Sequence, residues 1–125
     1  MNDQPISVLL VDDDEDTQNL LHAVMEHYNY PLSVAADSQG AVDYLAQHST
    51  DVILLDIFLP DRNGYDTLKI IRKNNPSNPP KIVAITAYYN DETPADMINR
   101  GFDGYLKKPL SPTELVPYLR DLMTA

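Results

Sequence analysis

Acidic and hydroxyl side chains stand directly after three apolar runs of this 125-residue sequence. The runs and the residues that follow them are Val8–Val11 with Asp12 and Asp13, Val52–Leu55 with Asp56, and Ile82–Ile85 with Thr86. If these runs are parallel strands of one sheet, their carboxyl ends share an edge and the polar side chains meet there. Lys107 and Lys108 follow the short segment 104–106 and would bring a cation to the same edge. Carboxylates, a hydroxyl and an ammonium in one crevice suit a phosphoryl group and a divalent metal ion.

Length and composition limit the classes of protein to consider. The length predicts a single domain over residues 1–125 with no separate output domain, and 43% apolar residues are enough for a two-sided core. Because the chain has no cysteine, a metal would be held by oxygen ligands or by His22, His27 or His48, which we expect at the surface in or beside helices. A formal charge of −10 argues against nucleic-acid binding and favours a protein partner. The chain has no apolar run of about eighteen residues and no targeting pattern at its start, so we expect a soluble cytoplasmic protein without a membrane partner.

Hydrophobic periodicity predicts strands that alternate with helices along the chain. The predicted strands are 6–11, 32–36, 51–55, 81–86 and 103–106, and the predicted helices are 15–28, 38–47, 65–73, 92–99 and 112–123. The strand 51–55 shows no polar alternation, as burial on both faces of a central parallel strand requires. We therefore expect an α/β fold, a five-stranded, doubly wound parallel sheet with five helices on its two faces.

Two of the predicted helices begin with capping signals. Ser38 can cap the second helix, and Ser111 and Glu114 form a capping box around Pro112 at the first position of the last helix. Pro117 then lies beyond the first turn of that helix, so we expect it to bend the helix at a cost of about 3 kcal/mol.

The five consecutive acids at the start of the first predicted helix allow two interpretations. Asp14, Glu15 and Asp16 are equally well explained by favourable charge and capping at a helix N-terminus. Asp12 and Asp13 fit that explanation less well, because carboxylates packed at a strand end repel each other unless a cation relieves them.

A purely structural interpretation competes with a role in phosphoryl chemistry for Asp56, Thr86 and Lys108. Asp56 could simply start a loop, but a carboxylate at the border of core and solvent can also form an acyl phosphate beside a metal ion. Threonine is common in strands, yet at a strand end Thr86 can donate a hydrogen bond to a phosphoryl oxygen. Lys108 precedes Pro109, which restricts where its side chain points, and the peptide bond between them could be cis or trans.

Four segments together resemble the receiver domains of two-component response regulators, of the chemotaxis-regulator type. They are Leu10–Asp14 (LVDDD), Asp56–Pro60 (DIFLP) with Gly64, Ile85–Ala87 (ITA) and Gly104–Pro109 (GYLKKP). They occur in the family's order and at similar separations, and the resemblance covers essentially the whole chain. It implies a flavodoxin-like sheet with strand order 2-1-3-4-5.

The resemblance also implies roles for the acidic residues. Asp56 would be the phosphoacceptor and would take the phosphoryl group from phosphohistidine of a partner kinase. Asp13 and Asp56 would bind Mg²⁺ directly, Asp12 would bind it mainly through water, and the backbone carbonyl of Phe58 would be a further ligand.

Signal output would follow from a change in packing. By resemblance, Lys108 would pair with the phosphoryl group, Thr86 would move to bind it, and Tyr105 would change its exposure, so that phosphorylation shifts the population between two packings. Tyr105 could equally be an aromatic residue that only packs. We expect no catalysis beyond the protein's own aspartyl phosphorylation and dephosphorylation.

The expected partners are a sensor histidine kinase or phosphotransfer protein, and a downstream protein. The downstream protein would dock on the face formed by the helix 92–99, the strand 103–106 and the last helix, and the chain would be a monomer or a phosphorylation-dependent dimer. Direct transcriptional control is not expected.

Two alternatives to a stand-alone receiver remain open. One is the receiver of a hybrid histidine kinase in a phosphorelay. Another is an aspartate-nucleophile phosphatase of the haloacid dehalogenase type, which requires Thr or Val where this sequence has Asp16.

Two aromatic residues flank the expected phosphorylation site. Phe58 follows Asp56 by two positions, and Tyr88 follows Thr86 by two. Large side chains there could shelter an acyl phosphate from water, so we predict a comparatively long-lived phosphoryl state.

Overall fold

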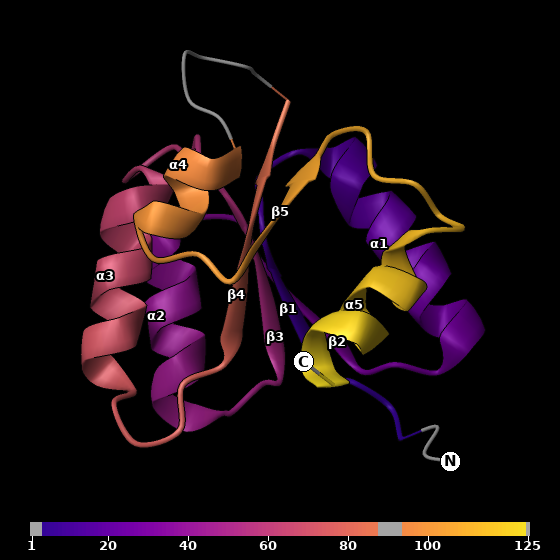
Figure 1. Ribbon diagram of the computed structural model, residues 1–125, viewed down its shortest axis with the longest axis horizontal. Coiled ribbons are helices and arrows are strands. Elements are labelled where there is room, and N and C mark those ends of the chain that lie inside the picture. The colour runs from indigo at the N-terminus through magenta and orange to yellow at the C-terminus, as the bar shows by residue number, and fades with distance from the viewer. Residues whose placement is uncertain (1–3, 88–93, 125) are drawn as a thin grey trace.

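Five parallel strands form one sheet in the order β2-β1-β3-β4-β5 in the computed structural model, which describes residues 4–87 and 94–124 (Figure 1). The strands are β1 (Val8–Val11), β2 (Leu32–Ala35), β3 (Val52–Asp56), β4 (Lys81–Thr86) and β5 (Gly104–Lys107). The helices are α1 (Glu15–Tyr28), α2 (Ser38–Gln47), α3 (Gly64–Asn74), α4 (Pro94–Asn99) and α5 (Leu115–Thr124). The predicted fold class and strand order are confirmed.

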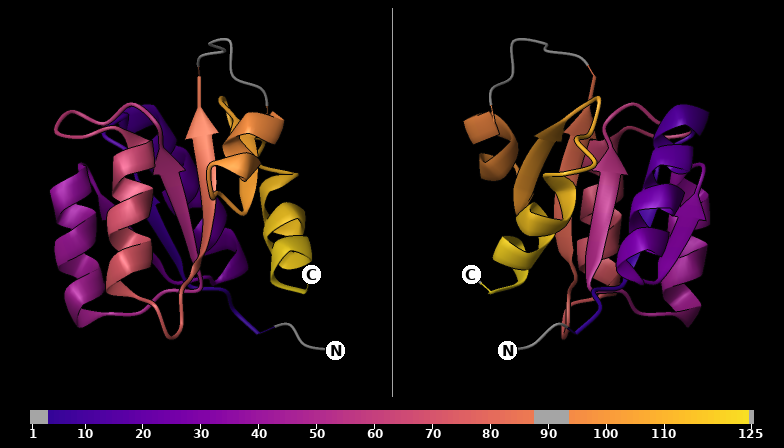
Figure 2. Two further views of the ribbon diagram at one scale, coloured as in Figure 1. Left: turned by 60° about the vertical axis from the view of Figure 1, so that its left-hand side comes forward. Right: turned by 90° about the vertical axis from the view of Figure 1, so that its right-hand side faces the viewer.

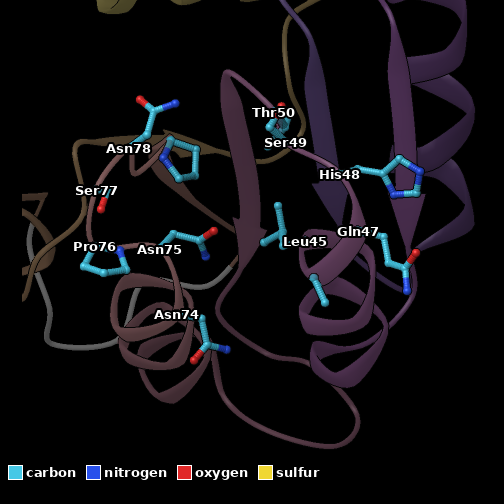
Figure 3. A pocket seen from close by; sticks show the side chains of 12 residues that line it. Leu45, Gln47, His48, Ser49, Thr50, Asn74, Asn75, Pro76, Ser77 and Asn78 are labelled. Carbon is cyan, nitrogen blue, oxygen red and sulfur yellow. The ribbon is translucent and has the colours of Figure 1, made fainter.

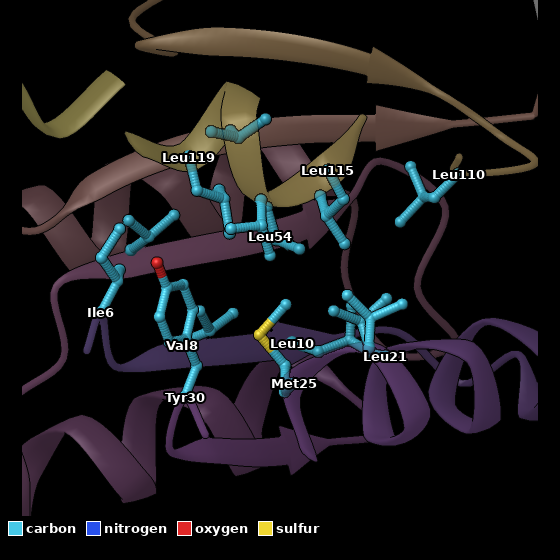
Figure 4. Packing of buried hydrophobic residues seen from close by; sticks show 14 of the residues in the cluster. Ile6, Val8, Leu10, Leu21, Met25, Tyr30, Leu54, Leu110, Leu115 and Leu119 are labelled. Atoms are coloured by element: carbon cyan, nitrogen blue, oxygen red, sulfur yellow. The ribbon is translucent and has the colours of Figure 1, made fainter. Parts of the chain in front are cut away.

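Helices cover both faces of the sheet (Figures 1 and 2). Along β1, Val8 and Leu10 pack with α1 and α5, whereas Leu9 and Val11 pack with α2, α3 and α4. Figure 4 shows the first of these two clusters, in which Met25 of α1 and Leu119 of α5 meet the sheet. Apolar side chains on both sides of the central strands explain why those strands carry no polar alternation.

Most element boundaries agree with the sequence prediction to within two residues. The helices 15–28 and 38–47 and the strand 81–86 match it fully, whereas β1 begins only at Val8. β3 continues through Asp56 and β5 through Lys107. The first two residues of the predicted helix 92–99 lie outside the described residues. None of the helices in the described part of the chain has the length and apolar character needed to cross a lipid bilayer.

The start of α2 differs from the prediction. Asp37, not Ser38, caps this helix, because its carboxylate Oδ1 accepts a hydrogen bond from the Gly40 N–H at 2.7 Å. Ser38 is the first helical residue and is fully buried.

The start of α5 also differs. Ser111 does accept a hydrogen bond from the Glu114 N–H at 3.3 Å, as the capping box predicts. The regular helix begins only at Leu115, so Pro117 is its third residue and lies in the first turn. The prediction of an interior proline is therefore wrong, because first-turn N–H groups have no acceptor within the helix and the interior penalty does not apply.

Candidate functional site

The carboxyl edge of the sheet brings the predicted acidic residues together. Asp12 follows β1, Asp56 ends β3, and these two strands are neighbours. One carboxylate oxygen from each of Asp12, Asp13 and Asp56 lies within 4.8 Å of the others. Asp12 is fully buried and Asp56 is only 6% exposed, whereas Asp13 is exposed. The cluster therefore has two carboxylates largely withdrawn from water and one that is open to it.

Lys108 reaches the same cluster from the end of β5. Its Nζ lies 2.7 Å from Asp12 Oδ2 and 3.5 Å from Asp56 Oδ2. Burial works against the ammonium, but the hydrogen bond to Asp12 and the charge of Asp56 outweigh it and raise the pKa of Lys108. The peptide bond between Lys108 and Pro109, which the sequence left open, is cis.

Asp56 is held in an unfavourable electrostatic environment. Burial and the neighbouring charge of Asp12 raise the pKa of Asp56 to about 6, although a hydrogen bond from the Phe58 N–H and the charge of Lys108 act in the opposite direction. Among the described residues, Lys108 supplies both ion pairs to the cluster. One ammonium does not balance three carboxylates. A set of oxygen donors with excess negative charge fits a hard divalent cation.

The loop that follows Asp56 returns closely to the end of β3. The Phe58 N–H donates to Asp56 Oδ1 at 3.1 Å, and the Gly64 N–H donates to the Ile57 carbonyl at 2.8 Å. A Cβ atom at Gly64 would lie 2.8 Å from both the Asp56 carbonyl oxygen and the Ile57 Cα. Gly64 belongs to the family-like motif in the sequence, and the structure adds the physical reason, because only glycine permits this close approach.

Thr86 and Tyr105 lie on the neighbouring strands β4 and β5. Thr86 ends β4, is 1% exposed, and accepts the Lys108 N–H on its backbone carbonyl at 2.9 Å. Tyr105 is half-buried and packs against the cluster on the α2, α3 and α4 side. Its N–H donates to the Tyr118 hydroxyl of α5 at 3.1 Å. The predicted residues thus occupy adjacent strands, and their part in switching stays a prediction.

Asp14 has a capping role. Its Oδ2 accepts hydrogen bonds from the Thr17 hydroxyl at 2.6 Å and from the Thr17 N–H at 3.2 Å. The hydroxyl bond is the largest of the effects that lower the pKa of Asp14. Glu15 and Asp16 stand in the first turn of α1, where negative charge is favourable. The capping interpretation of Asp14 is confirmed.

The three histidines and Phe58 have exposed side chains, and the second flanking aromatic lies outside the described residues. His22, His27 and His48 are exposed, as predicted. Phe58 is 47% exposed. Tyr88, the second residue predicted to shelter an acyl phosphate, lies outside the described residues.

A pocket at the opposite end of the sheet is separate from this cluster (Figure 3). It lies where α2 and α3 end, and Leu45, His48 and Asn75 are among the residues that line it. None of the described residues that line it carries a carboxylate or an ammonium. Among the described residues, this pocket therefore lacks the carboxylates and the ammonium that gather at the carboxyl edge.

A sequence model of the response regulator receiver domain matches residues 8–120. The chain belongs to this family, the receiver domains of two-component response regulators. Similar relatives include Transcriptional regulatory protein CpxR of Escherichia coli (strain K12), 34% identical over 93% of this chain and 48% of the relative. Response regulator SaeR of Staphylococcus aureus (strain USA300) is 30% identical over 94% of this chain and 50% of the relative. The chain thus spans about half the length of these relatives.

Solved structures agree with this assignment. A two-component response regulator from Clostridium difficile is 26% identical, with a TM-score of 0.85 over 97% of each chain. A CheY-like response regulator receiver domain protein from Methanospirillum hungatei JF-1 is also 26% identical, with a TM-score of 0.85 over 97% of this chain and 95% of the other.

Proposed function

We propose that Asp56 accepts a phosphoryl group from phosphohistidine of a sensor histidine kinase or phosphotransfer protein. The observation that carries this proposal is the position of Asp56, at the end of a central strand, within 4.8 Å of two further carboxylates and 3.5 Å from the Lys108 ammonium. Membership of the receiver family supports the choice of donor.

In the proposed step, a carboxylate oxygen of Asp56 attacks the phosphorus atom of the donor. A new O–P bond forms, the N–P bond to the donor imidazole breaks, and the ring nitrogen keeps the electron pair and takes up a proton. The Phe58 N–H orients the carboxylate by binding Oδ1, and Lys108 lies on the side of Oδ2. Lys108 is thereby placed to pair with the phosphoryl oxygens after transfer.

The acidic cluster would hold Mg²⁺ for this step. Asp13 and Asp56 would bind it directly, Asp12 through water, and the Phe58 carbonyl would complete the protein ligands. Bound Mg²⁺ supplies positive charge that offsets the charge of Asp56 and of the incoming phosphoryl oxygens. The excess of carboxylate charge over the single Lys108 ammonium supports this assignment.

The phosphoryl group would act as a switch for protein binding. Thr86 would bind it, Tyr105 would change its packing, and a downstream protein would dock on the face formed by α4, β5 and α5, where Ile98 is 45% exposed. The domain would catalyse only its own phosphorylation and dephosphorylation, and would act as a monomer or as a phosphorylation-dependent dimer.

The proposal is tested with a small phosphodonor and Mg²⁺. We expect one acid-stable, base-labile phosphoryl group per chain, measured by intact mass spectrometry. Asp56→Asn should abolish this incorporation, removal of divalent cations with EDTA should abolish it too, and the surface control Asp43→Asn should leave it unchanged. Continuous turnover of the donor without a stable phosphoprotein would instead support an aspartate-nucleophile phosphatase.

A further inference from the structure

The loop 57–63 after β3 is bound at its tip to the start of α2. Asp61 Oδ1 accepts the Ser38 N–H at 2.9 Å, and Asp61 Oδ2 accepts the Gln39 N–H at 3.0 Å. These are the first two N–H groups of α2, which have no acceptor within the helix. The bond from Ser38 is the largest of the effects that lower the pKa of Asp61. A carboxylate 22 and 23 positions away in sequence therefore completes the helix end.

A buried hydroxyl reinforces the same contact. Ser38 is fully buried, and its Oγ accepts hydrogen bonds from Arg62 Nη1 and from Thr67 Oγ1, each at 2.8 Å. The loop tip, the start of α2 and the first turns of α3 are thus joined by one set of hydrogen bonds, with Ser38 and Thr67 buried and Asp61 exposed. Figure 2 shows this loop at the end of the molecule where α2 begins.

The base of the same loop lies at Asp56. The Phe58 N–H binds Asp56 Oδ1, an isolated antiparallel bridge joins Phe58 to Asn63, and the Gly64 N–H binds the Ile57 carbonyl. The backbone of Phe58 is therefore held between the acceptor carboxylate on one side and the anchored tip on the other.

We propose that Asp61 is a positioning residue for the acidic site. By binding the start of α2, it holds the loop 57–63 in place and so fixes the Phe58 backbone that faces Asp56, which increases the affinity of the site for a divalent cation. This inference rests on the proposed Mg²⁺ site. It goes beyond that proposal by giving a role to a residue that does not touch the ion.

The test is a titration of the ¹⁵N-labelled full chain with MgCl₂ alone, followed by NMR without any phosphodonor. Asp61→Ala should weaken Mg²⁺ binding by about three- to tenfold, less than the roughly 10–100-fold typical for residues that hold a metal ligand directly. Its Phe58 amide resonance should also move in the metal-free state. Asp61→Asn retains one acceptor oxygen and should show the same changes to a smaller extent.

Asp37→Ala is the matched control. It removes the other carboxylate that caps α2, the one bound to the Gly40 N–H at 2.7 Å, without touching the loop 57–63. Both alanine variants should lose stability to urea, because both remove a helix cap. Only Asp61→Ala should change the Mg²⁺ affinity and the Phe58 resonance.

Three results would overturn the inference. Unchanged Mg²⁺ affinity in Asp61→Ala shows that the anchored tip has no influence on the site. Equal weakening in Asp37→Ala shows that general loosening of α2 is the cause. Failure of the unaltered protein to bind Mg²⁺ contradicts the proposed metal site itself, and that result is seen before any variant is made.

Discussion

Both ends of the sheet contain acidic and basic side chains in contact, but the ratio of carboxylates to cations differs between them. At the amino end, Arg72 Nη2 lies 2.8 Å from Asp103 Oδ2, which also accepts the Ile82 N–H at 2.8 Å. Arg72 donates further to the Pro80 and Gly101 carbonyls at 3.1 and 3.0 Å. At the carboxyl end, three carboxylates lie close together, and two of them, those of Asp12 and Asp56, pair with the ammonium of Lys108.

This difference separates a balanced ion pair from a cluster with excess negative charge. The pair at the amino end is balanced in charge and partly exposed, with about 30% of each side chain open to solvent (31% and 29%). At the carboxyl end, Asp12 and Asp56 are buried and the charges are unbalanced; burial and the charge of Asp12 raise the pKa of Asp56 to about 6. Groups with strongly shifted pKa values in such clusters are typical of functional sites, because a bound ligand can offset the repulsion between the charges.

Removal of the shared cation should have the largest effect on stability. Lys108→Met leaves Asp12 buried without its ion pair, and we expect the free energy of unfolding to fall by about 3 kcal/mol, the lower end for breaking one side of a buried pair. Urea denaturation at pH 7 in EDTA measures this loss. A loss no greater than that of an exposed pair would mean that the carboxyl edge is not electrostatically distinct.

Removal of one excess carboxylate should instead stabilise the fold. A carboxyl group whose pKa is higher in the folded state than in the unfolded chain destabilises the fold above that pKa. The pKa of Asp56 rises from 3.8 to about 6. Asp56→Asn should therefore increase the free energy of unfolding at pH 8 by at most about 3 kcal/mol, the equivalent of this pKa rise.

The pH dependence and a matched change at the other edge sharpen this prediction. The gain from Asp56→Asn should shrink as the pH falls from about 6 and disappear below 3.8, where both states of the wild-type group are protonated. Urea denaturation at pH 8, 6 and 4 follows it. Asp103→Asn should lower stability at pH 8, because it breaks a balanced pair. Loss of stability in both variants would contradict the proposed contrast.

The ion pair at the amino edge should contribute less than Lys108. Arg72→Met should lower the free energy of unfolding by about 1 kcal/mol, since partly exposed ion pairs contribute little and water can replace the lost donors. The loss should become smaller in high salt. If Arg72→Met costs as much as Lys108→Met, burial is not what distinguishes the two edges.

The smallest expected effect concerns the lifetime of the phosphoryl group at the carboxyl edge. Phe58→Ala should speed the loss of phosphate from Asp56, because a large side chain beside the acyl phosphate limits access of water. The same rate measurement on Tyr88→Ala tests the second predicted aromatic. Autodephosphorylation rates equal to that of the unaltered protein in both variants would show that shielding is wrong.

The acidic site could be predicted from the sequence, because the position of a residue at the end of a parallel strand determines at which edge of the sheet it lies. Uninterrupted apolar runs predict buried parallel strands, and residues that end such strands must meet at one edge. The sequence therefore predicts that Asp12, Asp56 and Lys108 lie close together, although they are up to 96 positions apart in the chain. In the structure, the Lys108 ammonium lies 2.7 Å from Asp12 Oδ2 and 3.5 Å from Asp56 Oδ2, in agreement with that prediction.

The helix starts were harder to predict, because they depend on contacts made elsewhere in the fold. Ser38 has the right chemistry for a cap, but its hydroxyl is used by Arg62 and Thr67, and Asp37 caps instead. Pro117 was placed inside a helix because the sequence contains a capping box that the structure uses for a turn before the helix.

The sequence by itself determined which residues end the strands, and with that the membership of the acidic cluster, because strand periodicity and parallel pairing are local and repetitive properties. Only the tertiary structure decided that the Lys108 ammonium lies closer to Asp12 than to Asp56. It also decided that the Lys108–Pro109 peptide bond is cis and that Asp61 accepts the Ser38 N–H at the start of α2. These features depend on distances between segments that are remote in the chain, and no residue pattern contains those distances.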